Sequence, residues 1–571
     1  MKELETLPRP EARTRATGGR LSKGAFLVLV WCALLHAFNV FVSLNMVTTT
    51  NVIYQRLYEP SEYGYLAAAV SQSIGYLLYP LAGLLAELRW TRYRTMMCGT
   101  ALVATGSIVL IPATLLFPNK WTADPAEVTA QSTRSTGPMT VGLLLFQCGM
   151  AMFEANAIQF GLDQLAFEST LTLCSFIHWY YWSAHFYLVP SIAEVGGPLW
   201  IQVATQIALA AVSLALVWLW RGHMNKEPPR QINPIRLVYA CLSFARTHKT
   251  PISRSAFTYG NETLPSRLDL AKSRYGGPFS TEQVEDVKSF GRILAIMLSA
   301  FGFLLLNTFN YTPEKFEPLR YPTRYGSVDW YVYLQSVACI AVAIAYIPFY
   351  QLVVVRHFPT LIPSIFKRLG IGLFVCVASL AINTALSCYT YVRIAATYTD
   401  CSTYFIGLNS TPRTYIFEEG GFVLYFHTAS QLLDGLAYVL VFLTMLEFIV
   451  AQSPIIMQGF LIGLWYAMQA FGVMLNVAFL TTYVAGGCQY WPDVAKTTLA
   501  AISLATFFAA ARRYKNRQRE EVSNLNEQCV IEEYYERQLS KSQSRLLTQC
   551  TEKASILESL QMSVLEHNTS T

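Results

Sequence analysis

Residues 198–220 read PLWIQVATQIALAAVSLALVWLW, an uninterrupted run without a single Asp, Glu, Lys or Arg. A helix needs about 20 predominantly apolar residues to cross the hydrocarbon core of a bilayer, and this run has that length. Stretches of the same kind occur about twelve times and together make up close to half of the chain. The sequence therefore predicts an all-α polytopic membrane protein.

The composition agrees with this interpretation. Of the 571 residues, 53% are hydrophobic and only 14% are charged, against roughly 25% charged in a typical soluble domain. The formal net charge of +6 is too small to point to nucleic acid as a partner. There is no phosphate-binding Gly-Lys-Ser loop, no H-E-x-x-H and no paired C-x-x-C spacing, so we expect no enzyme, no metal site and no cofactor.

A long polar break separates the predicted spans into two sets of six, which is the layout of a transporter with related halves. The break is rich in Pro, Arg and Ser. The predicted parts are a tail, a six-helix bundle, a linker, a second six-helix bundle and a second tail, at residues 1–22, 23–220, 221–290, 291–511 and 512–571.

The positive charge is distributed unevenly between the two sides of the membrane. If both tails and the linker face the cytoplasm, 33 of the 42 Lys and Arg residues lie there, as the positive-inside rule requires. We therefore predict a multi-pass protein of the plasma membrane or of an endomembrane, with both termini cytoplasmic. Within the linker, residues 235–244 have the pattern of an amphipathic helix suited to the membrane surface; a linker that only tethers the two halves is the alternative.

Two cysteines and one glycosylation sequence fall in loops predicted to face outward. Cys401 and Cys488 would meet oxidising conditions there, so a disulfide between them and two free thiols are the alternatives. Asn409 begins the sequence Asn409-Ser410-Thr411 and is the predicted acceptor of an N-linked glycan.

Two carboxylates lie in the middle of predicted spans. A charge at that depth costs about 2.5–3.5 kcal/mol on insertion scales, so such a group usually faces a cavity or a partner. Glu154 is surrounded by small residues and is a candidate proton carrier. Asp434 lies one helical turn before Tyr438, so both are candidates to line the transport path; the alternative for Asp434 is a hydrogen-bond partner that fixes helix packing.

The spans also contain histidines and aromatic residues of interest. His178 and His185 are seven residues apart on one helix face, and imidazole titrates between pH 5 and 8, so each could relay protons or simply form hydrogen bonds among aromatic residues. His36 is a weaker candidate of the same kind. Trp179 and Tyr438 are candidates to stack on a substrate. Two acids with no obvious buried Lys or Arg would suit a cationic or zwitterionic amine better than a free carboxylate.

Four stretches spread over both halves resemble one known family. Residues 156–165 read NAIQFGLDQL and are similar to N-x-x-x-F-G-x-D-Q-F, and residues 447–454 read EFIVAQSP and are similar to E-F-x-x-x-Q-x-P. Residues 83–95 resemble an acid-x-x-x-G-R-Y loop, and residues 176–189 resemble a signature on helix 5. Taken in their order along the chain, the stretches resemble the proton-dependent oligopeptide transporter (POT) family of the major facilitator superfamily. The residues to which this resemblance assigns site, gating or structural roles are Gly83, Glu87, Arg92, Asn156, Gly161, Asp163, Gln164, Glu447 and Pro454.

The resemblance implies a major facilitator fold with 12 transmembrane helices in two six-helix bundles, and transport by alternating access that is usually driven by protons. The chain departs from the family at the positions that carry coupling. The helix 1 E-x-x-E-R motif is missing, with Phe38, Phe41 and Val42 in its place. The family's helix 4 Lys falls on Glu154, and its helix 10 Glu falls on Tyr438.

We therefore predict a secondary-active solute carrier that moves small peptides or related small polar nitrogenous solutes. Its expected partners are the lipid bilayer, the solute and co-transported protons, with no obligate protein partner evident. Two alternatives stay open. One is a facilitator without proton coupling, and the other is a transporter-like sensor or scaffold without net flux, which the lost motif and a C-terminal tail of about 60 residues motivate.

Overall fold

The computed structural model describes most of the predicted spans. The described residues are 22–38, 70, 72–115, 125–165, 170–185, 199–222, 224, 226, 228, 233–248, 266–306, 324–325, 328–329, 341–397, 417–486 and 490–514. The predicted disulfide cysteines Cys401 and Cys488 and the predicted glycosylation site Asn409 lie outside them.

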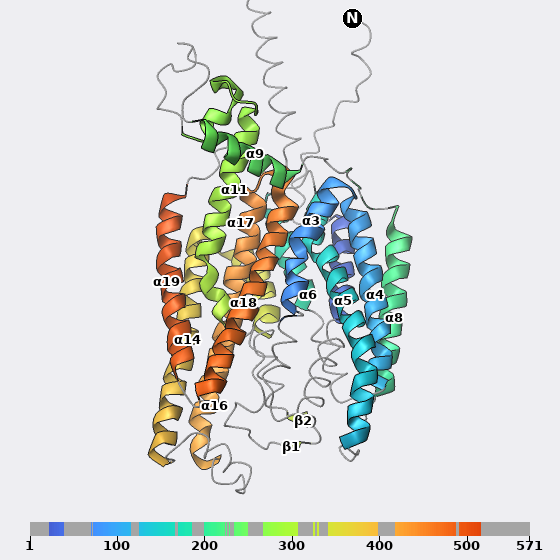
Figure 1. The fold of residues 1–571 in the computed structure, drawn as a ribbon, viewed down its shortest axis with the longest axis vertical. Helices are drawn as coiled ribbons and strands as arrows, with labels where there is room; N and C mark the ends of the chain where they lie inside the picture. Colours follow the sequence, from blue (N-terminus) through green and yellow to red (C-terminus); the bar gives the residue numbers. More distant parts are fainter. Residues whose placement is uncertain are drawn as a thin grey trace, which may run out of the picture. The chain divides into compact units, whose positions relative to one another are not determined.

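Helices dominate the described part of the chain (Figure 1). Those before the linker are Lys23–Phe38, α3 (Tyr79–Leu88), α4 (Arg92–Leu115), α5 (Pro125–Asp163), α6 (Thr170–His185) and α8 (Leu199–Trp220). Those after it are α11 (Thr281–Ser299), α13 (Val355–His357), α14 (Ile365–Thr397), α16 (Phe417–Tyr438), α17 (Thr444–Gln452), α18 (Gln458–Gly486) and α19 (Trp491–Arg513). We refer to these two sets as the N-terminal helices and the C-terminal helices.

Short elements complete the description. The 3₁₀ helices are η1 (Asp269–Ala271), η2 (Ser273–Tyr275), η3 (Phe301–Leu305), η6 (Pro359–Leu361) and η8 (Ile455–Met457). Two π-helical segments are η5 (Tyr350–Val354) and η7 (Val439–Leu443), and the second joins α16 to α17 without a break. Strands β1 (Arg324–Tyr325) and β2 (Val328–Asp329) form a two-residue antiparallel pair that the sequence analysis did not predict.

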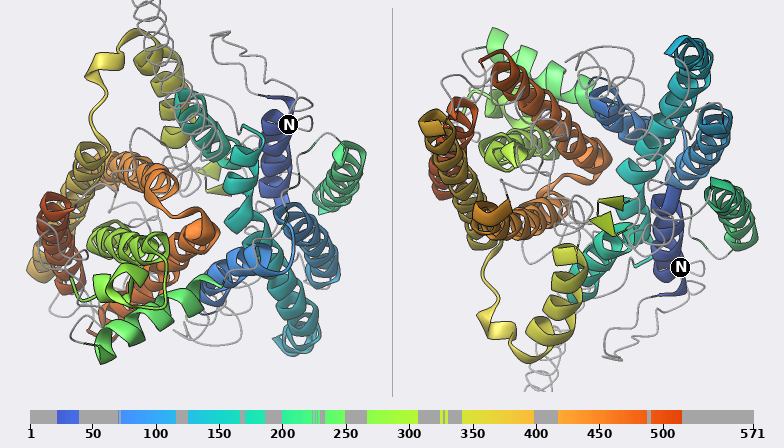
Figure 2. Two further views of the ribbon diagram at one scale, coloured as in Figure 1. Left: turned by 90° about the horizontal axis from the view of Figure 1, so that it is seen from above. Right: turned by 90° about the horizontal axis from the view of Figure 1, so that it is seen from below.

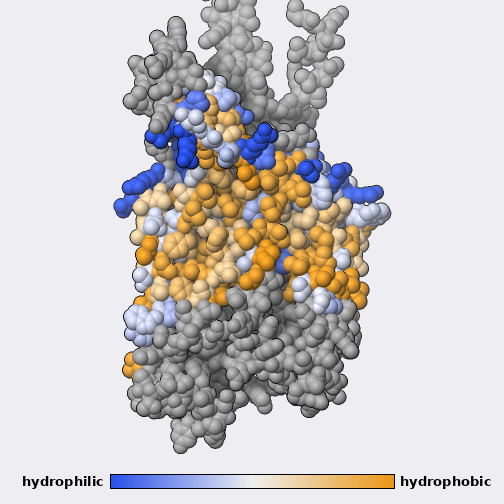
Figure 3. All heavy atoms as spheres, viewed as in Figure 1, coloured by the Kyte–Doolittle hydropathy of each residue, from blue (hydrophilic) through white to orange (hydrophobic). Residues whose placement is uncertain are grey.

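Seven helices in the described part of the chain are long and apolar enough to cross a membrane, and three shorter apolar helices lie at Lys23–Phe38, Ile207–Trp220 and Ala341–His357. Figure 3 shows the apolar side chains as a band around the helices, bounded by hydrophilic residues at the end where the linker lies. Large apolar residues such as Leu81, Trp218 and Phe374 are more than half exposed on this surface, as expected where lipid replaces water. The full count of twelve spans and the bounds of the five predicted parts stay predictions.

Glycines let helices approach closely within the N-terminal set. A Cβ added at Gly99 of α4 would lie 2.7 Å from the carbonyl oxygen of Gly149 on α5, and a Cβ at Gly106 would lie 2.7 Å from that of Gly142. Small residues at such crossings bring backbones together and replace the hydrophobic driving force that lipid does not supply. The α4–α5 pair is therefore a tightly packed unit that holds α5 in place.

The N-terminal and C-terminal helices lie on two sides of the molecule when viewed along their axes (Figure 2). They meet where α3 packs against α18. A Cβ added at Gly83 would lie 2.5 Å from the carbonyl oxygen of Gly459, and one added at Gly463 would lie 2.6 Å from that of Tyr79. Backbone lies against backbone at these two points, so neither glycine position has room for a side chain.

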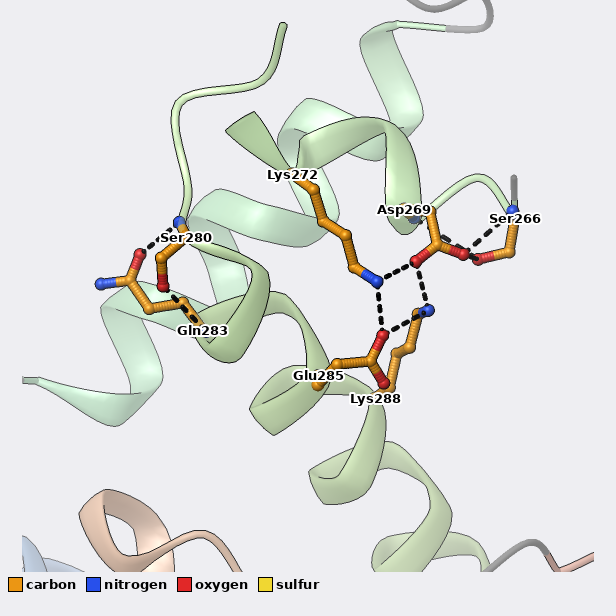
Figure 4. A network of polar contacts seen from close by, with 7 residues as sticks. All are labelled: Ser266, Asp269, Lys272, Ser280, Gln283, Glu285 and Lys288. Carbon is orange, nitrogen blue, oxygen red and sulfur yellow. Dashed lines mark hydrogen bonds and ion pairs between the residues drawn. The ribbon is translucent and has the colours of Figure 1, made fainter. Parts of the chain in front are cut away.

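The linker contains the predicted amphipathic helix, which extends over α9 (Pro234–Thr247). The Asn233 side chain caps it by accepting hydrogen bonds from the backbone N–H groups of Ile235 and Arg236, and Pro234 occupies its first turn. Helix α9 packs against α11 and η1. Where the linker enters α11, Ser280 and Gln283 form a reciprocal capping box (Figure 4).

Four charged side chains fasten the linker to α11 (Figure 4). The Lys272 ammonium lies 2.6 Å from the carboxylates of both Asp269 and Glu285, and Lys288 lies 2.5 Å and 3.0 Å from the same two groups. Partial burial alone would raise the pKa of Asp269, but hydrogen bonds from Lys272, Lys288 and Ser266 outweigh it and hold that pKa well below its usual range.

Candidate functional site

A buried carboxylate on α5 lies among helices of the N-terminal set. Glu154 is 7% exposed, and its Oε2 accepts a hydrogen bond of 2.8 Å from the hydroxyl of Tyr79 on α3. Its Oε1 lies 3.2 Å from Nε2 of His36 on the helix Lys23–Phe38. The partners of Glu154 described here are thus a phenol and an imidazole, and neither carries a fixed positive charge.

Aromatic rings extend this site to the C-terminal helices. Tyr79 stacks on Tyr466 of α18 with ring centroids 4.8 Å apart. Tyr466 contacts Phe442 at 5.5 Å, and Phe442 stacks on Tyr438 at 5.1 Å. Tyr181 of α6 lies 5.8 Å from Phe442 and so reaches the same rings from the N-terminal side. Glu154, His36, Tyr79 and Tyr466, which we call the Glu154 site, therefore join the two sets of helices.

Two further sequence candidates, His185 and Trp179, lie on α6. The His185 ring is 4.3 Å from that of Tyr181, and its Nδ1 is 2.8 Å from the Tyr181 carbonyl oxygen. Trp179 contacts Trp182 edge to face at 5.6 Å, and Trp182 donates a hydrogen bond to the carbonyl oxygen of Ile344 in the C-terminal set. The proposed substrate contacts of Trp179 and Tyr438 and the relay role of His185 stay predictions.

A second buried carboxylate forms a different kind of contact between the two sets. Glu447 on α17 is 4% exposed and receives a bidentate pair from Arg368 of α14, with nitrogen–oxygen distances of 2.6 Å and 3.2 Å. His178 of α6 forms a hydrogen bond with the same carboxylate and another with Gln351 in η5. Gln351 in turn accepts a hydrogen bond of 2.7 Å from Ser175. We call these residues the Glu447 cluster, and through them α6 is tied to three C-terminal elements.

Asp434 lies inside the C-terminal set. It is fully buried on α16 and accepts a hydrogen bond from Ser379 of α14, whose hydroxyl also lies 2.9 Å from that of Ser430. The buried Lys496 of α19 is close enough to interact electrostatically with Asp434 and Asp493. These contacts are those expected of a residue that fixes helix packing, and a role for Asp434 in the transport path stays a prediction.

The residues of the loop and helix-end motifs form a third group of contacts. Arg92 lies 2.5 Å and 2.7 Å from the two carboxylate oxygens of Asp163, which ties the start of α4 to the end of α5. The Glu87 carboxylate accepts a hydrogen bond of 2.7 Å from the backbone N–H of Gly459, so it joins α3 to α18. Beside it, Gln159 donates a hydrogen bond of 3.0 Å to Gln458.

The remaining motif residues have packing roles in the described structure. Asn156 donates to the carbonyl oxygens of Ala82 and Met152, and Gln164 donates to that of Phe160. A Cβ at Gly161 would lie 2.0 Å from the ring of Phe176, so only glycine fits there. Pro454 precedes η8 at the turn between α17 and α18. Among the described residues, no group of three or more His, Cys, Asp or Glu side chains is arranged to hold a metal.

Several functional contacts had no clear signal in the sequence. His36 was a weak candidate, and its partner Glu154 is over a hundred residues away on another helix. Tyr79 and Tyr466 sit in apolar helices where an aromatic residue is unremarkable. Lys496 could have been found from the sequence, because it lies inside a predicted span. It is 6% exposed, which corrects the expectation that there is no obvious buried Lys or Arg.

Comparison with known proteins identifies the fold. A sequence model described as the POT family matches residues 93–499. An auto-inhibited POT family peptide transporter aligns with a TM-score of 0.56 and 18% identity, covering 87% of this chain and 99% of that one. The POT family transporter PepTSo aligns with a TM-score of 0.53 and 15% identity, covering 85% and 97%. A POT family transporter in complex with 5-aminolevulinic acid aligns with a TM-score of 0.51 and 12% identity, covering 85% and 96%. The predicted all-α major facilitator fold is confirmed.

Proposed function

The chain belongs to the POT family, a family of membrane transporters and not of enzymes, and from this premise we propose that it is a proton-coupled carrier of small peptides or related small nitrogenous solutes. The observation that carries the proposal is the Glu154 site. A buried carboxylate that contacts His36 and Tyr79 lies next to a ring stack that joins the two sets of helices. The solved relative that holds 5-aminolevulinic acid supports solutes other than peptides.

In this proposal Glu154 carries the proton. A carboxylate without a permanent cation beside it can exist in the neutral or the charged form, and the surrounding burial disfavours the charged form unless a partner compensates. His36 at 3.2 Å is such a partner when it is protonated. The pair therefore replaces the helix 1 carboxylates that the family uses and that this chain lacks at Phe38, Phe41 and Val42.

Alternating access requires the two sets of helices to separate on one side at a time. The Glu447 cluster and the crossing of α3 with α18 are among the described contacts that such a movement would break. Arg368 and Glu447 both belong to the C-terminal set and would stay together, so within the cluster the bonds of His178 to Glu447 and Gln351 and the bond of Ser175 to Gln351 would have to open. Opening at this cluster would expose no unpaired carboxylate, because Glu447 would keep its pair with Arg368.

The test is solute uptake into proteoliposomes with and without an inward proton gradient, using dipeptides, free amino acids and organic cations. Wild-type protein should show gradient-stimulated uptake, and Glu154→Gln should reduce that stimulation at least tenfold, because the amide cannot carry a proton. The matched control is Glu282→Gln, the same chemical change at an exposed position of α11. Asp434→Asn, tested alongside, decides whether Asp434 belongs to the path.

Other outcomes would replace the proposal. Uptake that is independent of the gradient in the wild type would mean a facilitator. Binding without uptake would mean a sensor or scaffold. Full stimulation in Glu154→Gln would contradict the assignment of the proton to this carboxylate.

A further inference from the structure

We propose that the Glu154 site binds a cationic amine that has no free carboxylate, such as an amidated peptide or a simple organic ammonium ion. This inference rests on the proposed function, because it names the solute class that the same site would carry. It is argued from three observations: the sign of the charge at the site, the pairing of the buried basic residues, and the aromatic surface beside the carboxylate.

The first observation is that the Glu154 site contains an acid and no Lys or Arg. Its other members are the imidazole of His36 and the phenols of Tyr79 and Tyr466. A solute carboxylate placed here would be repelled by Glu154 at close range. A solute ammonium would be attracted, and the attraction is strong because the site is shielded from water.

The second observation is that buried basic side chains elsewhere in the described spans already face acids. Arg368 is held by both oxygens of Glu447, and Arg92 by both oxygens of Asp163. Lys496 has Asp434 and Asp493 as electrostatic neighbours. Taking one of these cations to bind a solute carboxylate would leave a buried acid unpaired, which is strongly unfavourable. None of these three cations is therefore ready for a free carboxylate.

The third observation is the aromatic surface. The stacked rings of Tyr79 and Tyr466 lie directly beside the carboxylate, and ring faces attract ammonium ions. The buried hydroxyl of Tyr180 lies close to the Cys32 thiol, and it is close enough to Tyr466 and Glu154 to interact with them electrostatically. A thiol is a weak hydrogen-bonding group, so this hydroxyl is a further polar group that a bound solute could engage.

The experiment uses three probes that differ only in terminal charge: Ala-Phe, its C-terminal amide, and N-acetyl-Ala-Phe. Binding to the full-length purified protein is measured by calorimetry at pH 7.5. The amide, which is a cation, should bind at least tenfold more tightly than zwitterionic Ala-Phe, and the acetylated anion should bind more weakly than both. Glu154→Gln should reduce the amide's advantage to less than threefold, whereas Glu154→Asp and the exposed control Glu282→Gln should retain it.

The result that would overturn the inference is a zwitterion that binds as tightly as the amide, or an amide preference that survives in Glu154→Gln. Either result would leave the proposed function intact if Ala-Phe is still taken up into proteoliposomes. Conversely, an amide preference without any uptake would support the cation site and contradict the carrier. If Glu154→Gln does not fold, the wild-type ranking of the three probes decides alone.

Discussion

Glu154 and Glu447 are carboxylates of similar burial on helices that face the junction between the two sets, yet their partners differ in kind. Glu447 is held by a guanidinium that is always charged and by an imidazole, whereas Glu154 contacts an imidazole and a phenol. A carboxylate with a permanent counter-charge keeps its own charge and serves as a fixed point for packing. One whose partners are neutral or titratable is able to change its charge, which is what proton carriage requires.

Removing the permanent partner should have the largest effect. In Arg368→Ala, Glu447 loses its guanidinium partner and keeps the contact with His178, and we expect a loss of about 3–5 kcal/mol in the free energy of unfolding, as when a buried pair is broken. The measurement is thermal unfolding of the purified protein in detergent. The double variant Arg368→Met with Glu447→Gln should recover most of the loss, since no buried charge is left unpaired. A single variant as stable as the double one would mean that Glu447 does not depend on Arg368.

The next-largest effect is expected where the backbones of α3 and α18 cross, at the junction between the two sets of helices. Gly83→Ala places a methyl group 2.5 Å from the Gly459 carbonyl oxygen, which forces α3 and α18 apart at a cost of about 1–3 kcal/mol. Uptake should fall because the conformation in which α3 and α18 are in contact becomes less populated. The matched control is Gly291→Ala in α11, where an added Cβ meets nothing within 4 Å. Equal unfolding temperatures for the two variants would show that the crossing tolerates a side chain.

A smaller effect sharpens the comparison at Glu154 itself. Tyr79→Phe removes the 2.8 Å hydrogen bond to Glu154 but keeps the ring that stacks on Tyr466. We expect a loss of about 1 kcal/mol in stability, the usual contribution of one hydrogen bond, and reduced but measurable uptake. A loss as large as that of Arg368→Ala would indicate that Glu154 is a fixed structural charge like Glu447.

The smallest effect is expected at the linker, where Asp269 shares two lysines with Glu285 near the surface. The folded-state pKa of Asp269 lies below the value of about 3.9 for an unfolded chain. Its contribution to stability is therefore fully present above that pH and is lost as the pH falls towards the folded-state pKa. The unfolding temperatures of wild type and Asp269→Asn should differ by a constant amount from pH 5 to 8. They should begin to converge as the pH falls below about 4. A difference that persists unchanged to pH 3 would contradict the role of the ionised carboxylate.

Local sequence pattern was sufficient for the spans, the capped linker helix and the candidacy of Glu154, because each depends on residues close together in the chain. Partner choice was not predictable in the same way. His178 was a candidate, but nothing near it indicated Glu447, which lies 269 positions away and was assigned through its motif. Tyr466 gave no signal, since its stacking on Tyr79 follows from how α18 crosses α3.

The expectation for Asp434 shows how a correct local argument can be incomplete. Placing it on the same face as Tyr438 was sound for two residues four apart in a helix. The described hydrogen bond of Asp434 nevertheless goes to Ser379, and the described ring contact of Tyr438 with Tyr181 crosses to the N-terminal set. Two residues on one face can still have different neighbours when three helices converge on it.

The π-helical segment η7 has a consequence for how one continuous helix serves two tasks. A π-turn acts as one extra residue in an α-helix, and one residue corresponds to a rotation of about 100°. Everything after Leu443, including Glu447, is therefore turned relative to Asp434 by about a quarter of the circumference compared with an unbroken helix. Deleting one residue within Val439–Leu443 would remove the π-turn and leave Glu447 facing Arg368 and His178, whereas rewinding the intact segment as a regular α-helix would turn Glu447 away from them. The π-turn thus sets the orientation of the helix after Leu443. Asp434 before it contacts Ser379 in its own set of helices, and Glu447 after it contacts His178 in the N-terminal set.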